Sequence, residues 1–231
     1  MNQAPPTDPV AKARRSSAVG RLHVLVDSLE LADLAVSAGA PVVQLRAKTL
    51  TDAALRDLAE QVAGLCGERG STLIVNDRPD VAAAVGAGVH VGALDAEPRE
   101  ARVIIGEDAI LGVTARTPGM ALAAQDAGAD YVGVGPVYVS GTKAGLPNPI
   151  GPAGVGAVAA CVEIPAIAIS GIEPADTREL ILRGAYGVAV SGAVARAADP
   201  ASVVSAFLDE IGKARLTLGN GAGRTNAEAD A

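Results

Sequence analysis

Short apolar segments rich in β-branched residues recur along this chain at a nearly constant interval. This repetition limits the fold more than any other feature of the sequence. The starts of successive segments lie about 23 residues apart on average. Segments this short and this apolar along their whole length are typical of β-strands that are covered on both faces. The sequence therefore predicts eight strands, at Leu22–Val26, Val42–Leu45, Thr72–Val75, Val89–Val91, Ile110–Val113, Tyr131–Val134, Ala166–Ile169 and Tyr186–Val190.

Most of the intervals between these strands carry the periodicity of an amphipathic helix. One apolar stripe runs from Leu55 to Cys66 and another from Val203 to Ile211. Strands that alternate with helices pair in parallel through right-handed crossovers. Eight such units in 231 residues predict an α/β fold, a single-domain (β/α)8 TIM barrel over residues 19–214. An open, doubly wound sheet is the alternative, but no G-x-G-x-x-G follows the first strand.

The two ends of the chain and its charge exclude several classes of protein. Residues 1–18 and 215–231 lack apolar periodicity, which predicts disordered tails. A net charge of −7 argues against a broad nucleic-acid or membrane-binding surface, and no stretch has the pattern of a signal peptide or a membrane helix. The two cysteines, Cys66 and Cys161, have no metal-ligand spacing and fit a reducing, cytoplasmic location. A homo-oligomer is compatible with this sequence.

Polar side chains follow the predicted strands at the end where barrel enzymes carry their active sites. After the second strand, period-two alternation sends Gln44, Arg46 and Lys48 to the same side. Two cations at this spacing are by themselves typical of a solvated loop. Together with the amide, they also indicate a place where an anion binds.

Two carboxylates come at equivalent levels of the next two strands. Asp77 follows Asn76 at the end of the third strand, and Asp95 follows the fourth. Such residues often serve only as turns or caps. However, two carboxylates facing two cations are what a magnesium–diphosphate site requires, because Mg²⁺ binds one or two carboxylates together with waters and phosphate oxygens. His90 lies within the fourth strand, and we interpret it as structural rather than catalytic.

A segment without periodicity follows the sixth strand and runs to Gly151. It contains Ser140, Thr142 and Lys143. Its length of about fifteen residues is more typical of a loop that covers a substrate than of a plain connection. We therefore expect it to close over a ligand and to bring Lys143 to the site as a third cation.

Ser-Gly pairs follow the seventh and eighth strands, at Ser170-Gly171 and Ser191-Gly192, each before a predicted helix. The loops after these strands commonly bind phosphate in barrels, because free N–H groups at helix starts point at the anion and glycine lets it approach. One such pair is a weak signal. Two of them at paired positions predict a second phosphate site.

In their order along the chain, these residues resemble the thiamine phosphate synthases. The resemblance extends from about Leu22 to Pro200 and depends on Gln44–Lys48, Asn76–Arg78, Val89–Gly92 with Asp95, Ala129–Pro136 and Thr142-Lys143. It implies that Asp77 and Asp95 hold Mg²⁺. It also implies that the pyrimidine diphosphate is surrounded by Gln44, Arg46, Lys48, Asn76, Thr114 and Lys143, and that the thiazole phosphate faces Ser140, Thr142, Ser170, Gly171, Ser191 and Gly192.

The resemblance implies a transferase that joins hydroxymethylpyrimidine diphosphate to hydroxyethylthiazole phosphate, giving thiamine phosphate and diphosphate. The family reaction is a largely dissociative displacement assisted by magnesium. Its main demands on the protein are to neutralise the departing diphosphate and to exclude water. Arg46, Lys48 and Lys143 would be the catalytic cations, and a Ser/His/Asp set is not needed.

Several positions depart from the family pattern, which makes the acceptor end less secure than the diphosphate end. Ala93 stands where glutamine is common, Ser170 where glycine is common and Gly192 where serine is usual. Two alternatives follow: a noncatalytic paralogue that senses a phosphorylated thiazole or pyrimidine, and an enzyme like the related thiazole tautomerase. That tautomerase uses a histidine at the position of Arg116, and a pure sensor has no need of a complete leaving-group site.

Overall fold

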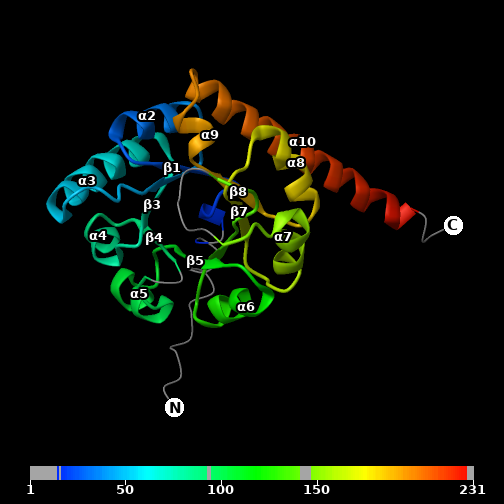
Figure 1. Cartoon of the computed structure of the whole chain (residues 1–231), viewed down its shortest axis with the longest axis horizontal. Helices are drawn as coiled ribbons and strands as arrows, with labels where there is room; N and C mark the ends of the chain where they lie inside the picture. Colours follow the sequence, from blue (N-terminus) through cyan, green and yellow to red (C-terminus); the bar gives the residue numbers. More distant parts are fainter. Residues whose placement is uncertain (1–14, 16, 93–94, 141–146, 228–231) are drawn as a thin grey trace, which may run out of the picture.

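The structure is a computed structural model of the chain and describes residues 15, 17–92, 95–140 and 147–227. Eight parallel strands close into a barrel in chain order, and the helices surround it (Figure 1). The strands are β1 (Leu22–Val26), β2 (Val42–Leu45), β3 (Thr72–Asn76), β4 (Gly88–Val91), β5 (Leu111–Ala115), β6 (Tyr131–Val134), β7 (Ala166–Ile169) and β8 (Gly187–Val190). The predicted single-domain (β/α)8 barrel is confirmed, and all eight predicted strands are present with ends shifted by at most two residues.

The helices that follow the strands occupy the predicted intervals. They are α2 (Leu29–Ser37), α3 (Asp52–Arg69), α4 (Pro79–Ala84), α5 (Pro98–Ile105), α6 (Pro118–Asp126), α7 (Gly151–Ala159), α8 (Pro174–Leu182), α9 (Gly192–Ala195) and α10 (Pro200–Ala227). Helices α6 and α8 each begin with a proline that follows a capping residue. Thr117 accepts a hydrogen bond from the Met120 N–H at 3.3 Å, and Glu173 forms a reciprocal capping box with Asp176.

Two apolar cores lie on the two faces of the strands. Alternate residues such as Val24 and Val43 pack outward against the helices, in a large buried cluster. Their neighbours Leu25 and Val42 point into the barrel, in a smaller cluster that includes Tyr131. This alternation explains why the strands are apolar throughout, because a strand covered on both faces has no side left for water. The filled interior leaves room for ligands only at the mouths of the barrel.

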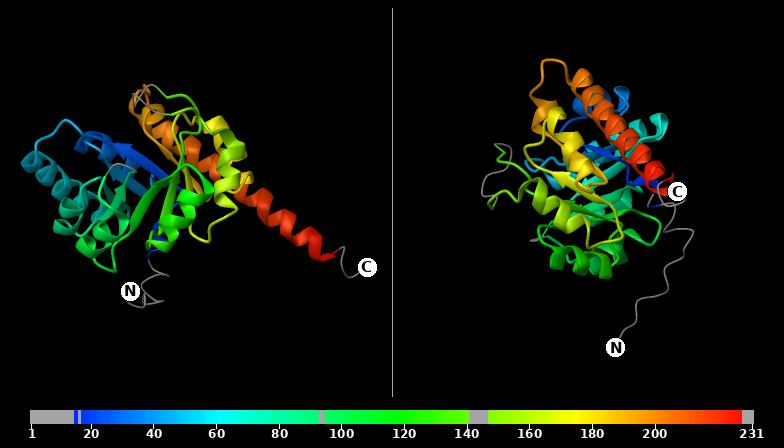
Figure 2. Two further views of the ribbon diagram at one scale, coloured as in Figure 1. Left: turned by 60° about the horizontal axis from the view of Figure 1, so that its bottom comes forward. Right: turned by 90° about the vertical axis from the view of Figure 1, so that its right-hand side faces the viewer.

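The predicted ends of the folded body need correction on both sides. Arg15, expected in a disordered tail, is only 4% exposed and pairs with Asp130 at 2.7 Å. At the other end, α10 continues to Ala227, past the predicted boundary at residue 215 (Figure 2). Apolar periodicity detects neither feature, because a buried ion pair holds the first and helix propagation along the chain extends the second. None of the helices in the described part of the chain combines the length and the hydropathy that a membrane span requires.

His23 is a fully buried histidine in β1. Its Nε2 atom hydrogen-bonds the Val19 carbonyl oxygen, and its Nδ1 atom has no partner among the residues the structure describes. The ring stands edge-on to Tyr131, with 5.1 Å between the ring centroids. Burial disfavours the charged ring and lowers the pKa of His23 to about 4, although hydrogen bonds to the backbone partly oppose this shift.

This burial predicts that acid destabilises the protein through His23. In the unfolded chain His23 becomes protonated as the pH falls below about 6.5. In the folded chain it stays neutral until the pH reaches about 4. The contribution of His23 is therefore complete above pH 6.5 and is lost as the pH falls through this window. Urea unfolding at pH 7 and 4.5 should show a loss of about 2–3 kcal/mol that is absent in His23→Gln. Equal losses in the two proteins would contradict the assignment.

Candidate active site

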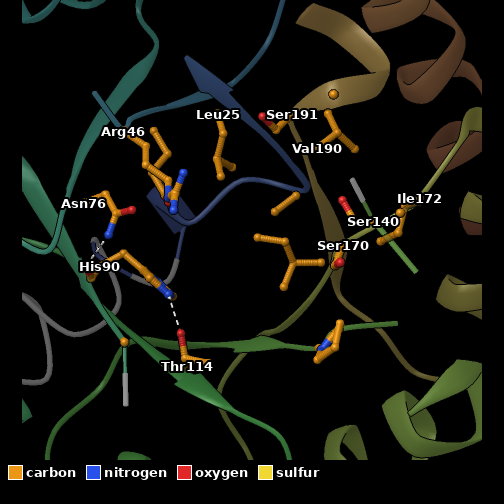
Figure 3. Close-up of a pocket in the computed structure, with 18 of the residues that line it drawn as sticks. Leu25, Arg46, Asn76, His90, Thr114, Ser140, Ser170, Ile172, Val190 and Ser191 are labelled. Carbon is orange, nitrogen blue, oxygen red and sulfur yellow. Dashed lines mark hydrogen bonds between the residues drawn. The ribbon is translucent and has the colours of Figure 1, made fainter. Parts of the chain in front are cut away.

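The carboxyl ends of the strands surround a cavity of about 350 Å³. It is lined by twelve of the fourteen residues predicted for the site: Gln44, Arg46, Lys48, Asn76, Asp77, Asp95, Thr114, Ser140, Ser170, Gly171, Ser191 and Gly192. The other two, Thr142 and Lys143, lie outside the described residues, together with the rest of segment 141–146 of the predicted covering loop. Figure 3 shows two sides to the cavity, with Arg46, Asn76 and His90 across from Ser140, Ser170 and Ser191.

The side formed by β2 supplies cations. Gln44, Arg46 and Lys48 all line the cavity, as alternation along the strand predicts. The backbone N–H of Arg46 donates to the Val26 carbonyl oxygen at 2.7 Å, which extends the pairing with β1 and holds the residue at the rim. Its guanidinium forms no ion pair within the described part of the chain. An unpaired guanidinium at this place is available to an anionic ligand.

The side formed by β3 and β4 supplies carboxylates. Asp77 lies in the left-handed region at a φ of 60°, and its carboxylate contacts the Lys48 ammonium and the Asn76 amide. A non-glycine residue in this conformation is uncommon and often marks a functional position. Asp95 accepts a hydrogen bond from the Gly92 N–H at 2.7 Å.

This donor set fits a magnesium ion. Both carboxylates line the same cavity, and no group of three or more metal-binding side chains exists among the described residues. Mg²⁺ commonly uses only one or two carboxylates and takes its remaining ligands from water and phosphate. In this structure Lys48 is the positive partner of Asp77, so the carboxylate is already held in an arrangement that suits a cation.

His90 links three strands, β4, β5 and β6, at the wall of the cavity. Its ring nitrogens hydrogen-bond the Tyr131 hydroxyl at 2.9 Å and the Thr114 hydroxyl at 3.0 Å. Glycines make room for these rings, because a Cβ on Gly112 would lie 2.1 Å from the Tyr131 ring and one on Gly133 would lie 2.9 Å from His90. These contacts agree with the interpretation of His90 as a structural residue, although it also lines the cavity.

The side formed by β7 differs from the prediction in its local geometry. Ser170 has a φ of 89° and Gly171 a φ of 68°, and the Ser170 hydroxyl donates to the Tyr138 carbonyl oxygen at 3.3 Å. The hydroxyl therefore ties this loop to the segment after β6. The Ser-Gly pair was expected directly before a helix, but α8 begins only at Pro174, which has no N–H to offer an anion.

On the side formed by β8, the helix that follows the Ser-Gly pair is shorter than the sequence predicts. Ser191 precedes α9, but this helix has only four residues and the Ser191 side chain makes no capping hydrogen bond. Aligned peptide dipoles add along a helix, so α9 contributes little field toward an anion. The predicted phosphate loops are thus in place at the cavity, while their helix starts are weaker than predicted.

Gly171 packs where a side chain does not fit. A Cβ there would lie 2.6 Å from the Val139 carbonyl oxygen and 2.8 Å from the Tyr138 Cβ, and the left-handed backbone adds strain. We expect Gly171→Ala to lower the free energy of unfolding by about 2–4 kcal/mol in urea titrations. Gly119→Ala, in the open first turn of α6, is the matched control and should leave stability unchanged or slightly raised. Equal effects of the two variants would contradict the packing argument.

Sequence reasoning missed two cations that line the cavity. Arg116 follows β5, and its Nε atom is buried without a hydrogen-bond partner among the described residues. Arg196 follows α9. Alternation from Thr114 points Arg116 to the same side, which was an available signal. Nothing in the sequence marks Arg196, because its position depends on how a four-residue helix folds back.

Fold and cavity together define a class of protein, the (β/α)8-barrel enzymes in which strand-end loops bind phosphorylated small molecules. Comparisons with known proteins identify the family. The family described as thiamine monophosphate synthase matches residues 20–194, so this chain belongs to that family. The predicted resemblance is confirmed, as is the prediction of an enzyme, a transferase of thiamine biosynthesis.

Individual relatives agree with this family assignment. A thiamine-phosphate synthase from Salinispora tropica is 47% identical over 205 residues, which is 84% of this chain and 99% of the relative. Another from Haloquadratum walsbyi is 44% identical over 75% of this chain and 79% of the relative. Among solved structures, a thiamine phosphate pyrophosphorylase from Pyrococcus furiosus has a TM-score of 0.78 and 29% identity, and the match covers 87% of this chain and 98% of that one.

Proposed function

We propose that this enzyme condenses hydroxymethylpyrimidine diphosphate with hydroxyethylthiazole phosphate, releasing diphosphate and forming thiamine phosphate. The observation that carries the proposal is the single cavity lined by cations and carboxylates on one side and by three serines on the other. A diphosphate substrate and a monophosphate substrate carry different charges, so each needs its own set of binding groups in the cavity. Membership of the thiamine monophosphate synthase family supports the same reaction.

The diphosphate belongs on the side formed by β2, β3 and β4. Arg46 can donate two parallel hydrogen bonds to phosphate oxygens, because its guanidinium has no ion-pair partner among the described residues. Lys48 can turn from Asp77 toward the ligand, since its side chain is 51% exposed. Gln44, Asn76 and Thr114 offer neutral hydrogen bonds around the pyrimidine, and Lys143 is assigned as a third cation by the family resemblance alone.

Asp77 and Asp95 would hold the magnesium ion. The bound ion would act as a Lewis acid that offsets the charge of the departing diphosphate. The protein prepares for it by orienting both carboxylates, since Asp77 contacts the Asn76 amide and Asp95 accepts a hydrogen bond from the Gly92 N–H. Fixed groups of this kind need little reorganisation when the bond breaks.

Carbon–oxygen cleavage in such a reaction needs charge stabilisation more than a general base. The aminopyrimidine ring spreads the positive charge that develops as the diphosphate leaves, and the thiazole nitrogen already carries the lone pair that forms the new bond. No proton has to be removed from the nucleophile. The structural role of His90 is consistent with this requirement, since both of its ring nitrogens are engaged by hydroxyls.

The thiazole phosphate belongs on the side formed by β6, β7 and β8. Ser140, Ser170 and Ser191 supply hydroxyls there, and Gly171 and Gly192 also line this side. Thr142 is added on the family resemblance. The apolar side chains of Leu25 and Ile169 form part of the wall and suit an aromatic ring.

Product analysis tests the proposal directly. Purified protein given both substrates and Mg²⁺ should form thiamine phosphate and release one equivalent of diphosphate, whereas either substrate alone should give neither product. Binding without turnover would support the noncatalytic paralogue, and conversion of a thiazole isomer alone would support a tautomerase.

The location in the cytoplasm and a homo-oligomeric state remain part of the proposal, and the two free cysteines support a reducing compartment.

A further inference from the structure

The side chain of Arg196 lies over Gly192 at the β8 edge of the cavity. A Cβ on Gly192 would lie 2.0 Å from the Arg196 Nη1 atom and 2.7 Å from its Cζ atom. The guanidinium therefore fills the space that any larger residue at position 192 would use. Both residues line the cavity, beside Ser191. Residues four apart lie on the same side of a helical turn, which brings the Arg196 side chain back over the start of α9.

Arg196 is a cation without a protein partner within residues 15, 17–92, 95–140 and 147–227. Some other arginines in this part of the chain are paired, for example Arg102 with Asp130 at 2.6 Å and Arg183 with Glu179 at 3.4 Å, whereas Arg46 on the opposite side of the cavity is not. No described carboxylate forms an ion pair with Arg196, although Glu173 lines the same cavity. A guanidinium that is left unpaired in a ligand cavity can bind an anion without first breaking an ion pair.

Among the described residues, the rest of this side supplies little positive charge. Ser140, Ser170 and Ser191 are neutral, and the Ser170 hydroxyl donates to a carbonyl oxygen of the protein. Helix α9 has four residues, and the carboxylates of Glu173 and Asp176 form a capping box at the start of α8, so neither helix start offers a strong positive field to an anion. Hydrogen bonds from charged donors are roughly twice as strong as those from neutral donors. A cationic side chain on this side would therefore strengthen the binding of a phosphate well beyond what its neutral donors provide.

We propose that Arg196 binds the phosphate group of the acceptor substrate and that Gly192 is the residue that lets it do so. This inference rests on the proposed function for the identity of the acceptor. The planar guanidinium presents two parallel N–H groups, which match two phosphate oxygens. Glycine is needed at position 192 because it has no side chain. Its backbone is not in the left-handed region, so the conformation alone does not require glycine. Arg196 and Gly192 thus form one substrate-binding unit.

Steady-state kinetics of Arg196→Gln, Gly192→Ala and the double variant test this unit. For Arg196→Gln we expect the KM of the thiazole phosphate to rise about 10- to 100-fold, with kcat and the KM of the pyrimidine diphosphate nearly unchanged. Gly192→Ala should raise the same KM by displacing the flexible guanidinium. The double variant should be no worse than Arg196→Gln alone, because the two changes remove one interaction.

The matched control is Arg183→Gln, which removes an exposed arginine at the end of α8 and should leave every constant unchanged. Additive losses in the double variant would overturn the inference, because Gly192 would then act independently of Arg196. Equal increases in both KM values for Arg196→Gln would also overturn it, since they indicate a general effect on the fold.

Calorimetry with inorganic phosphate separates this inference from the proposed reaction. Phosphate is titrated into protein that holds Mg²⁺ and excess diphosphate, so that the opposite side of the cavity is filled. Arg196→Gln should weaken phosphate binding about 10-fold or more relative to the unaltered protein, whether or not thiamine phosphate is formed. Equal phosphate affinity of the two proteins would exclude Arg196 as the anion ligand. Absence of turnover together with a lost phosphate site would contradict only the proposed reaction.

Discussion

Replacing Asp77 by asparagine is expected to lower kcat about 100-fold or more and to raise the Mg²⁺ concentration needed for half-maximal activity about 10-fold or more. The change keeps the shape of the side chain and removes the charge that attracts the cation. It should not unfold the protein, because asparagine tolerates the left-handed backbone, with a φ of 60°, that Asp77 adopts. The measurement is the initial rate of diphosphate release across a range of Mg²⁺ concentrations.

The matched control for this variant is Asp80→Asn. Asp80 lies three residues further on, in the first turn of α4, and pairs with Arg78 outside the cavity. Arg78 also pairs with Asp52, so it is turned toward the helices even though it is part of the motif that carried the resemblance. Asp80→Asn should keep both kcat and the Mg²⁺ requirement. An unchanged Mg²⁺ requirement in Asp77→Asn would show that Asp77 does not bind the metal.

Replacing Asp130 by asparagine is expected to lower the free energy of unfolding by about 3–5 kcal/mol. Asp130 is 5% exposed and accepts hydrogen bonds from the side chains of Arg15 at 2.7 Å and Arg102 at 2.6 Å. It also accepts one from the Leu111 N–H at 2.8 Å. Without its charge, two largely buried guanidinium groups lose their counter-ion, and their desolvation is no longer offset.

Urea unfolding of Asp130→Asn should show this loss as a lower midpoint with a nearly unchanged slope. The control is Asp126→Asn, an exposed carboxylate at the end of α6, which should change stability by less than about 0.5 kcal/mol. Removing residues 1–15 should reproduce part of the loss, since it deletes Arg15. Wild-type stability in Asp130→Asn would show that the buried ion pairs do not hold the amino-terminal segment.

The fold was predictable because its signal is repeated. Each strand is a short apolar segment and each interval has a helical stripe, so an error in one unit does not change the topology. The site was predictable for a related reason. In a parallel barrel all strands end at one mouth, so polar residues just after each strand must meet, as Gln44, Asp77 and Thr114 do.

The features that could not be predicted depend on tertiary contacts. Arg15 is buried through an ion pair with a residue 115 positions away, and local periodicity carries no information about such a pair. Arg196 reaches the cavity because Gly192 leaves a space that is visible only in three dimensions. The orientation of the Ser170 hydroxyl depends on the left-handed backbone at that residue, which its residue type does not favour.

A crystal structure of the protein with diphosphate and Mg²⁺ is the decisive experiment for this site. We expect the diphosphate to contact the guanidinium of Arg46 and the ion to lie between its oxygens and the carboxylates of Asp77 and Asp95. Diphosphate bound away from Arg46, or an ion bound without either carboxylate, would contradict this assignment of the leaving-group site.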